Sequence, residues 1–171
     1  MTRFLTLCLL AISATGVQAG DQYIDRSGYA AGGYDVVAFH GLPPGAPATP
    51  GSATFTAQHN GAVWAFSSAA SRDRFAADPS RYAPQYDGHC AYGVAQGYKV
   101  PGNPNLWQLV DGRLYLNIVP RVARTWSRDT AGYIARSEGA WPSLDATAAS
   151  TGSWRARRAN RDTFSDNTPS R

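Results

Sequence analysis

Cysteine, lysine and glutamate are scarce in this sequence of 171 residues. It contains two cysteines, Cys8 and Cys90, together with a single lysine, Lys99, and a single glutamate, Glu138. Cys90 is the only cysteine after the first twenty residues, and one cysteine cannot form an internal disulfide or a dithiol redox pair. This scarcity excludes a disulfide-stapled scaffold and a dithiol oxidoreductase.

The sequence patterns of several familiar enzyme classes are also absent. There is no glycine-rich phosphate loop, no Ser-His-Asp constellation with supporting context, and no closely spaced carboxylate pair suited to acid/base catalysis. The formal net charge of +4 is too small for a nucleic-acid-binding surface. We therefore expect a protein that is not an enzyme and does not bind nucleic acid.

Residues 1–19 have the pattern of a secretory signal peptide. Arg3 forms a short basic region, and an apolar run over 4–12 follows that is too short to span a bilayer. Val17-Gln18-Ala19 fits the small-x-small cleavage rule, so cleavage is predicted before Gly20. The protein is then expected in the periplasm or outside the cell, without a later transmembrane segment.

Composition divides the rest of the chain into three parts. Residues 20–33 are polar and contain glycine, which predicts an N-terminal arm. Residues 34–142 hold most of the aromatic residues and predict the folded domain. After residue 142 the composition shifts to Ser, Thr, Ala, Arg and Asn, so residues 143–171 are predicted to be a disordered basic tail.

Two dipeptides predict β-hairpins. Asn60-Gly61 separates one pair of β-prone runs and Asp111-Gly112 another, and each dipeptide suits a two-residue type I′ turn. Asp35 is expected to turn the backbone through an Asx-type hydrogen bond. The other predicted elements are a short strand or strand-like turn over 34–40 and helices over 69–77, 90–96, 120–128 and 130–137. The predicted fold class is α+β, with two hairpins and short packed helices.

The run from residue 66 to residue 82 resembles the YHS domain. Phe66, Ser68, Phe75, Pro79 and Tyr82 match the spacing of that family. The Asp-Val-Val at 35–37 is similar to the family's opening Asp-Pro-Val, and the Gly-Ala-Trp-Pro at 139–142 is similar to the end of its longer exported branch. The resemblance covers residues 34–142 and implies a small YHS-like α+β domain.

The resemblance does not carry the family's heavy-metal site to this chain. Metal-handling members have cysteines where this chain has Ser67 and Ser71, and Ala38 stands near the place of the cysteine in the family's opening Cys-Gly-Met. Hydroxyl groups are poor ligands for soft metals. Any metal site in this chain would therefore be a different one, centred on Cys90.

Three hypotheses describe the stretch around Cys90. In the first, the Cys90 thiolate binds a soft metal ion, copper above all, together with His89 and the distant His40 or His59. In the second, a helix N-terminus and His89 activate the Cys90 thiolate for chemistry. In the third, Cys90 is packed in the core of a metal-free module that contacts another protein of the envelope.

The interpretation drawn from the sequence is an exported, non-catalytic domain with a candidate copper site at Cys90, His89 and His40. The metal-free accessory module with a structural, buried Cys90 is the alternative.

Overall fold

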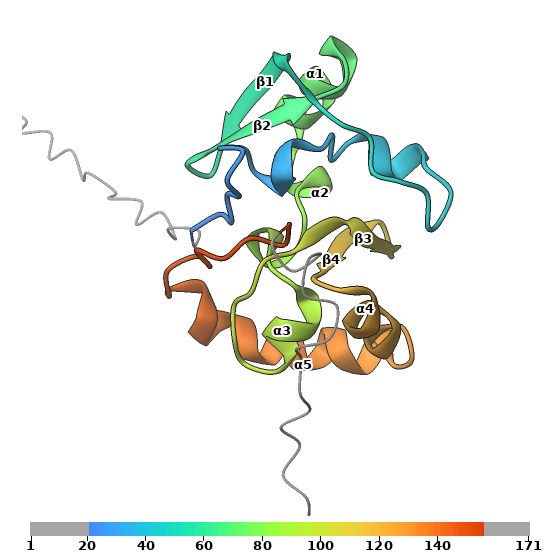
Figure 1. Ribbon diagram of the computed structural model, residues 1–171, viewed down its shortest axis with the longest axis vertical. Coiled ribbons are helices and arrows are strands. Elements are labelled where there is room, and N and C mark those ends of the chain that lie inside the picture. The colour runs from blue at the N-terminus through green and yellow to red at the C-terminus, as the bar shows by residue number, and fades with distance from the viewer. Residues whose placement is uncertain (1–20, 156–171) are drawn as a thin grey trace, which may run out of the picture.

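The protein folds as a small α+β domain of two β-hairpins and short helices, as the sequence predicts. A computed structural model describes residues 21–155. The elements in chain order are η1 (Ala31–Gly33), η2 (Ala38–Gly41), β1 (Ser52–His59), β2 (Ala62–Phe66), α1 (Ala69–Ala77), α2 (Pro79–Tyr82), η3 (Tyr86–Gly88), α3 (Ala91–Ala95), β3 (Asn103–Val110), β4 (Arg113–Asn117), α4 (Pro120–Trp126) and α5 (Thr130–Asp145). Figure 1 shows β1, β2 and α1 at one end of the molecule, and β3, β4, α3, α4 and α5 at the other.

Both hairpins are antiparallel and close with the predicted turns. β1 pairs with β2, and β3 pairs with β4, each with a register shift near the open end of the hairpin. Both central residues of each turn have positive φ: 48° at Asn60 and 69° at Gly61, 49° at Asp111 and 74° at Gly112. Positive φ at both positions defines a type I′ turn, whose twist matches that of the paired strands. The turn chemistry read from the sequence is therefore confirmed.

The helices begin at side-chain caps and at prolines. The Ser68 hydroxyl accepts a hydrogen bond from the Ser71 N–H at the start of α1, and the Asp78 carboxylate accepts one from Arg81 at the start of α2. Pro120 occupies the first turn of α4, where a missing N–H costs nothing. α1 and α4 therefore begin at Ala69 and Pro120, where the sequence predicts helices to start.

Of the strand and the strand-like turn that the sequence left open over residues 34–40, the structure has the turn. Tyr34 makes one isolated bridge to Pro50, and the backbone then turns into η2. The fully buried carboxylate of Asp35 causes this turn, because its Oδ1 accepts hydrogen bonds from the N–H groups of Val37 (3.0 Å) and Ala38 (3.2 Å). Its Oδ2 accepts two more from Ser67, at the end of β2 (2.9 and 2.6 Å). The expected Asx bond of Asp35 is thus confirmed, and it ties the turn to the first hairpin.

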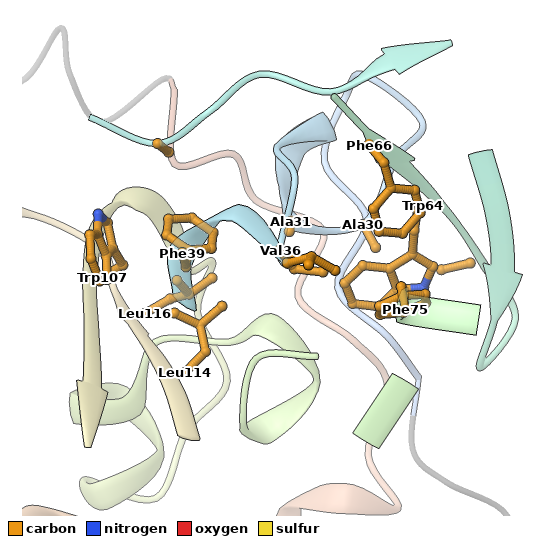
Figure 2. Packing of buried hydrophobic residues seen from close by; sticks show 13 residues of the cluster. Ala30, Ala31, Val36, Phe39, Trp64, Phe66, Phe75, Trp107, Leu114 and Leu116 are labelled. Carbon is orange, nitrogen blue, oxygen red and sulfur yellow. The ribbon is translucent and has the colours of Figure 1, made fainter. Parts of the chain in front are cut away.

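One hydrophobic cluster joins the two hairpins. Figure 2 shows Trp64, Phe66 and Phe75 on one side of the cluster, Val36 in the middle, and Phe39 on the other side together with Trp107, Leu114 and Leu116. The rings of Phe39 and Trp107 lie 5.1 Å apart, and those of Phe66 and Phe75 also 5.1 Å. A second cluster packs α3, α4 and α5 against β4 around Trp126 and Tyr115. Burial of these aromatic side chains supplies most of the driving force for folding such a small domain.

Two predicted boundaries of the folded domain are wrong. Residues 21–33 are not a separate arm, because Tyr23, Ala30 and Ala31 are buried. Nor does the fold end at residue 142. α5 continues to Asp145 through Pro142, and Trp154 is only 1 % exposed. The predicted signal peptide and the part of the predicted tail from residue 156 onward lie outside the described residues.

The reason for the longer α5 lies in its packing. A proline inside a helix removes one backbone hydrogen bond and costs about 3 kcal/mol. Trp141 and Leu144, on either side of Pro142, pack against the second cluster. Partial burial of these two large apolar side chains offsets a cost of that size. None of the helices between residues 21 and 155 has the length and apolar character needed to span a bilayer.

Candidate functional site

A left-handed turn leads into Cys90. Tyr86, Asp87 and Gly88 have φ values of 59°, 52° and 76° in succession. A left-handed backbone is unfavourable for residues with a side chain and persists only where the surroundings hold it in place. No pattern in the sequence predicts this conformation at Tyr86 and Asp87.

Carbonyl hydrogen bonds hold the turn in its strained shape. The Tyr86 carbonyl accepts the His89 N–H at 2.9 Å, and the Gly88 carbonyl accepts the Gly102 N–H at 3.1 Å. The Asp87 carbonyl accepts the Tyr23 N–H at 2.9 Å and the Gln22 side-chain amide at 2.6 Å. The N-terminal residues are therefore part of the scaffold around the site.

The His89 side chain is fully buried and uses both ring nitrogens within the protein. Its Nε2 accepts a hydrogen bond from the Ser150 N–H at 3.1 Å. A nitrogen that accepts cannot carry a proton, so the proton of the neutral ring is on Nδ1, which donates to the Tyr86 carbonyl at 2.9 Å. Burial lowers the pKa of His89 to about 4, and the positive charge of Lys99 acts in the same direction. The ring is thus neutral at neutral pH and already has two partners.

Cys90 is fully buried and precedes α3 as its N-cap residue. Its Sγ donates to Oδ1 of Asn117 at 3.6 Å, and the same oxygen accepts the Tyr92 N–H at 3.3 Å. Because the Tyr92 N–H needs an acceptor, the Asn117 side-chain amide must turn its oxygen, not its NH₂ group, towards Tyr92 and Cys90. Because an oxygen acceptor faces the sulfur, this contact favours the protonated thiol over the thiolate. This neighbour opposes the thiolate that the hypothesis of an activated cysteine requires.

The side chains of His89 and Cys90 diverge. Both residues have extended backbone, with ψ values of 162° and 118°, and successive side chains of an extended chain point to opposite faces. The ring of His89 lies near the rings of Tyr23 and Trp141, whereas the sulfur of Cys90 faces Asn117 on β4. The structure therefore places the two adjacent candidate ligands in different surroundings.

The rings of the other two histidines pack against aromatic side chains. The ring of His40 packs edge-on against Tyr82 with 5.0 Å between centroids, and burial together with the nearby Arg81 lowers its pKa. The ring of His59 packs in the same way against Phe75 at 5.8 Å. Within residues 21–155, no group of three or more His, Cys, Asp or Glu side chains is placed to hold a metal ion.

The carboxyl group of Asp87, in the left-handed turn, has a raised pKa. Burial raises the pKa of its carboxyl group to about 6, and the neighbouring Asp145 carboxylate contributes to the rise while Lys99 opposes it. Its Oδ1 lies 3.5 Å from the side-chain amide of Asn60 in the first hairpin. Asp87 thus links the left-handed turn to the end of α5 and to the β1–β2 turn.

An open hollow of about 350 Å³ lies between the β3–β4 turn and α5. It is lined by Val110, Asp111, Arg113, Tyr115, Ile134 and Glu138. Arg113 and Glu138 form an exposed ion pair at 3.3 Å. The lining contains neither cysteine nor histidine, so it is separate from the residues that the sequence singled out.

Comparisons with known proteins identify no relative of this chain. No family model, no curated protein and no solved structure matches the chain. The resemblance to the YHS domain therefore stays a prediction.

Sequence reasoning missed the residues that surround His89 and Cys90. Asn117 ends the second hairpin, and its position beside α3 follows from the bridge between Cys90 and Leu116. Ser150 lies in the segment that was expected to be disordered. Its contact with His89 joins residues 61 positions apart, and no local pattern signals such a contact.

Proposed function

We propose that this chain is a non-catalytic, metal-free binding module of the cell envelope, in which His89 and Cys90 hold the fold together. The observation that carries the proposal is that the protein itself uses His89 and Cys90, the two adjacent residues of the three candidate ligands. Both nitrogens of His89 are hydrogen-bonded, and the thiol of Cys90 donates to Asn117. A metal ion would have to displace these partners and separate two buried groups from their surroundings.

The envelope location rests on the predicted signal peptide. A cysteine that is buried and hydrogen-bonded is compatible with an oxidising compartment, where an accessible thiol would be a liability. The absence of enzyme signatures from the sequence supports a role in binding another protein. We accordingly place its partner among the proteins of the envelope.

A Cu(I) titration tests the metal-free part of the proposal. The chain from Gly20 to Arg171, and the same chain with Cys90→Ser, are titrated with Cu(I) in competition with a chromogenic chelator. We expect both proteins to leave the chelator's copper in place, with indistinguishable curves. Stoichiometric binding that is lost in the Cys90→Ser protein would contradict the proposal and support the copper hypothesis.

A further inference from the structure

The segment after α5, residues 146–155, is here called the strap. It runs back along the N-terminal residues, and in Figure 1 it lies, in red, next to the start of the described chain, in blue. Residues 146–152 are largely exposed, whereas Ser153 and Trp154 are buried. The strap thus consists of a lightly attached run followed by an anchor.

The lightly attached run is held through its backbone. The Thr147 carbonyl accepts a hydrogen bond from Nζ of Lys99 at 2.7 Å, and the Gly152 carbonyl accepts one from the Tyr23 hydroxyl at 3.0 Å. Between them, the Ser150 N–H donates to Nε2 of His89 at 3.1 Å. None of these three contacts uses a strap side chain. Any extended segment of similar length could make the same hydrogen bonds.

The anchor consists of Trp154 and Arg155. The indole of Trp154 lies 6.3 Å from the ring of Tyr34, and a side chain at Gly32 would bring a Cβ atom within 3.1 Å of its Nε1. The Arg155 guanidinium stacks over this indole at 4.4 Å. The missing side chain at Gly32 therefore makes room for the tryptophan.

The arginine of the anchor meets a buried charge. Nε of Arg155 lies 3.0 Å from Oδ2 of Asp25, whose side chain is 0 % exposed, and another guanidinium nitrogen donates to the Gly32 carbonyl at 3.0 Å. Although burial alone would raise the pKa of Asp25, hydrogen bonds from Ser27 and the contact with Arg155 keep it below its usual value. A buried carboxylate beside a carbonyl matches the planar, forked guanidinium better than any other side chain.

This arrangement has the two parts of a peptide-recognition site. Backbone hydrogen bonds provide attachment that does not depend on sequence, and pockets for particular side chains provide specificity. We propose that Lys99, His89 and Tyr23, together with the pocket of Asp25, Gly32 and Tyr34, form a peptide-binding groove that the chain's own strap occupies. The partner that fits it is an extended protein segment of small residues ending in a Trp-Arg pair. The inference rests on the proposed function, since it assigns the binding surface of that module.

Binding of a strap peptide to a protein without its own anchor tests the inference. The probe is a fluorescein-labelled peptide with the sequence of residues 147–155, TAASTGSWR, followed by fluorescence polarisation. The protein is the chain from Gly20 to Arg171 with Trp154→Ala and Arg155→Ala. Because its own strap no longer competes, we expect it to bind the peptide at least tenfold more tightly than the unchanged chain.

Matched controls identify the contacts involved. A peptide with alanine in place of Trp and Arg should not bind, and adding Asp25→Asn to the double variant should weaken binding at least tenfold. Asp73→Asn, which changes an exposed carboxylate paired with Arg72, should leave binding unchanged. A cooperative unfolding transition checks that each variant is folded. If the double variant does not fold, Arg155→Ala alone takes its place, again with tighter peptide binding than the unchanged chain expected.

Failure of a folded variant to bind the peptide, or equal binding of the alanine peptide, would overturn the inference. Neither result would affect the copper titration, which tests the proposed function separately.

Discussion

At the scale of single residues, His89 differs from a metal-binding histidine in the state of its ring. A ligating histidine offers one nitrogen to the metal and donates from the other. In this protein the nitrogen that would be offered accepts the Ser150 N–H instead. The imidazole thus connects the left-handed turn to the strap, and it does so only while it is neutral.

The neutral state of His89 makes stability depend on pH. Its folded-state pKa of about 4 lies below the ordinary value of 6.5, so the unfolded chain takes up a proton first as the pH falls. The stability that His89 contributes is therefore complete above pH 6.5 and is lost as the pH falls towards 4. The difference between these two pKa values corresponds to about 3 kcal/mol.

We expect His89→Gln to remove that part of the pH dependence. Urea unfolding between pH 4 and pH 7.5 should show a smaller difference between the two proteins at pH 4 than at pH 7.5. Asp87, whose raised pKa acts in the opposite direction, titrates in both proteins and cancels from the comparison. His59→Gln serves as the control and should keep the slope of the unchanged chain. An unchanged slope in His89→Gln would show that His89 is not the titrating group.

Asp35 is the second residue on which the fold depends. Its two carboxylate oxygens receive four hydrogen bonds, from Val37, Ala38 and Ser67. In Asp35→Asn, an NH₂ group replaces one oxygen and faces backbone N–H donors in either orientation. We expect a loss of about 2–4 kcal/mol in the free energy of unfolding. Asp73→Asn, at an exposed position, should change it by less than about 0.5 kcal/mol.

At the scale of elements, the two hairpins are specified by their turns. Gly112 has a φ of +74° with nothing within 4 Å of where a Cβ would stand, so conformation alone requires glycine there. Gly139 has equally open surroundings but lies inside α5 with ordinary helical φ. A methyl group would meet no neighbouring atom at either glycine, so the two positions differ only in backbone conformation.

Substitution of each glycine by alanine should have opposite effects. Gly112→Ala is expected to lower the free energy of unfolding by about 1 kcal/mol, because alanine disfavours a left-handed backbone. Gly139→Ala is expected to raise it by up to about 1 kcal/mol, because alanine favours helix. Thermal unfolding of both variants measures the difference. A stabilising Gly112→Ala would contradict the type I′ turn.

Local chemistry also explains which elements could be predicted. The Asn-Gly and Asp-Gly turns and the starts of α1 and α4 each depend on residues close by in the chain, and the sequence predicts them correctly. At Asp35 the sequence predicted the local Asx bond but left a strand and a turn both open, because half of the hydrogen bonds of this carboxylate come from Ser67, 32 residues away. The left-handed turn before Cys90 depends likewise on distant partners at Gln22, Tyr23 and Gly102.

At the scale of the whole molecule, the two ends of the described chain enclose the candidate site. Residues 22–23 support the left-handed turn, and the strap covers His89. Composition predicted both segments to lie outside the folded domain, because single anchoring side chains such as Tyr23 and Trp154 carry little weight in the average composition of a polar segment. The sequence thus singles out the stretch around His89 and Cys90, but the burial of these two residues depends on contacts that no local pattern shows.

The accessibility of Cys90 tests the central claim that this residue serves the fold. The chain from Gly20 to Arg171 has Cys90 as its single cysteine, so iodoacetamide labelling across a urea series reports on that thiol alone. The account predicts that labelling follows global unfolding, at the rate set by the fraction of unfolded protein, and that Cu(I) does not change it. Rapid labelling without urea that Cu(I) suppresses would contradict the account, because the thiol would then be both accessible and a metal ligand.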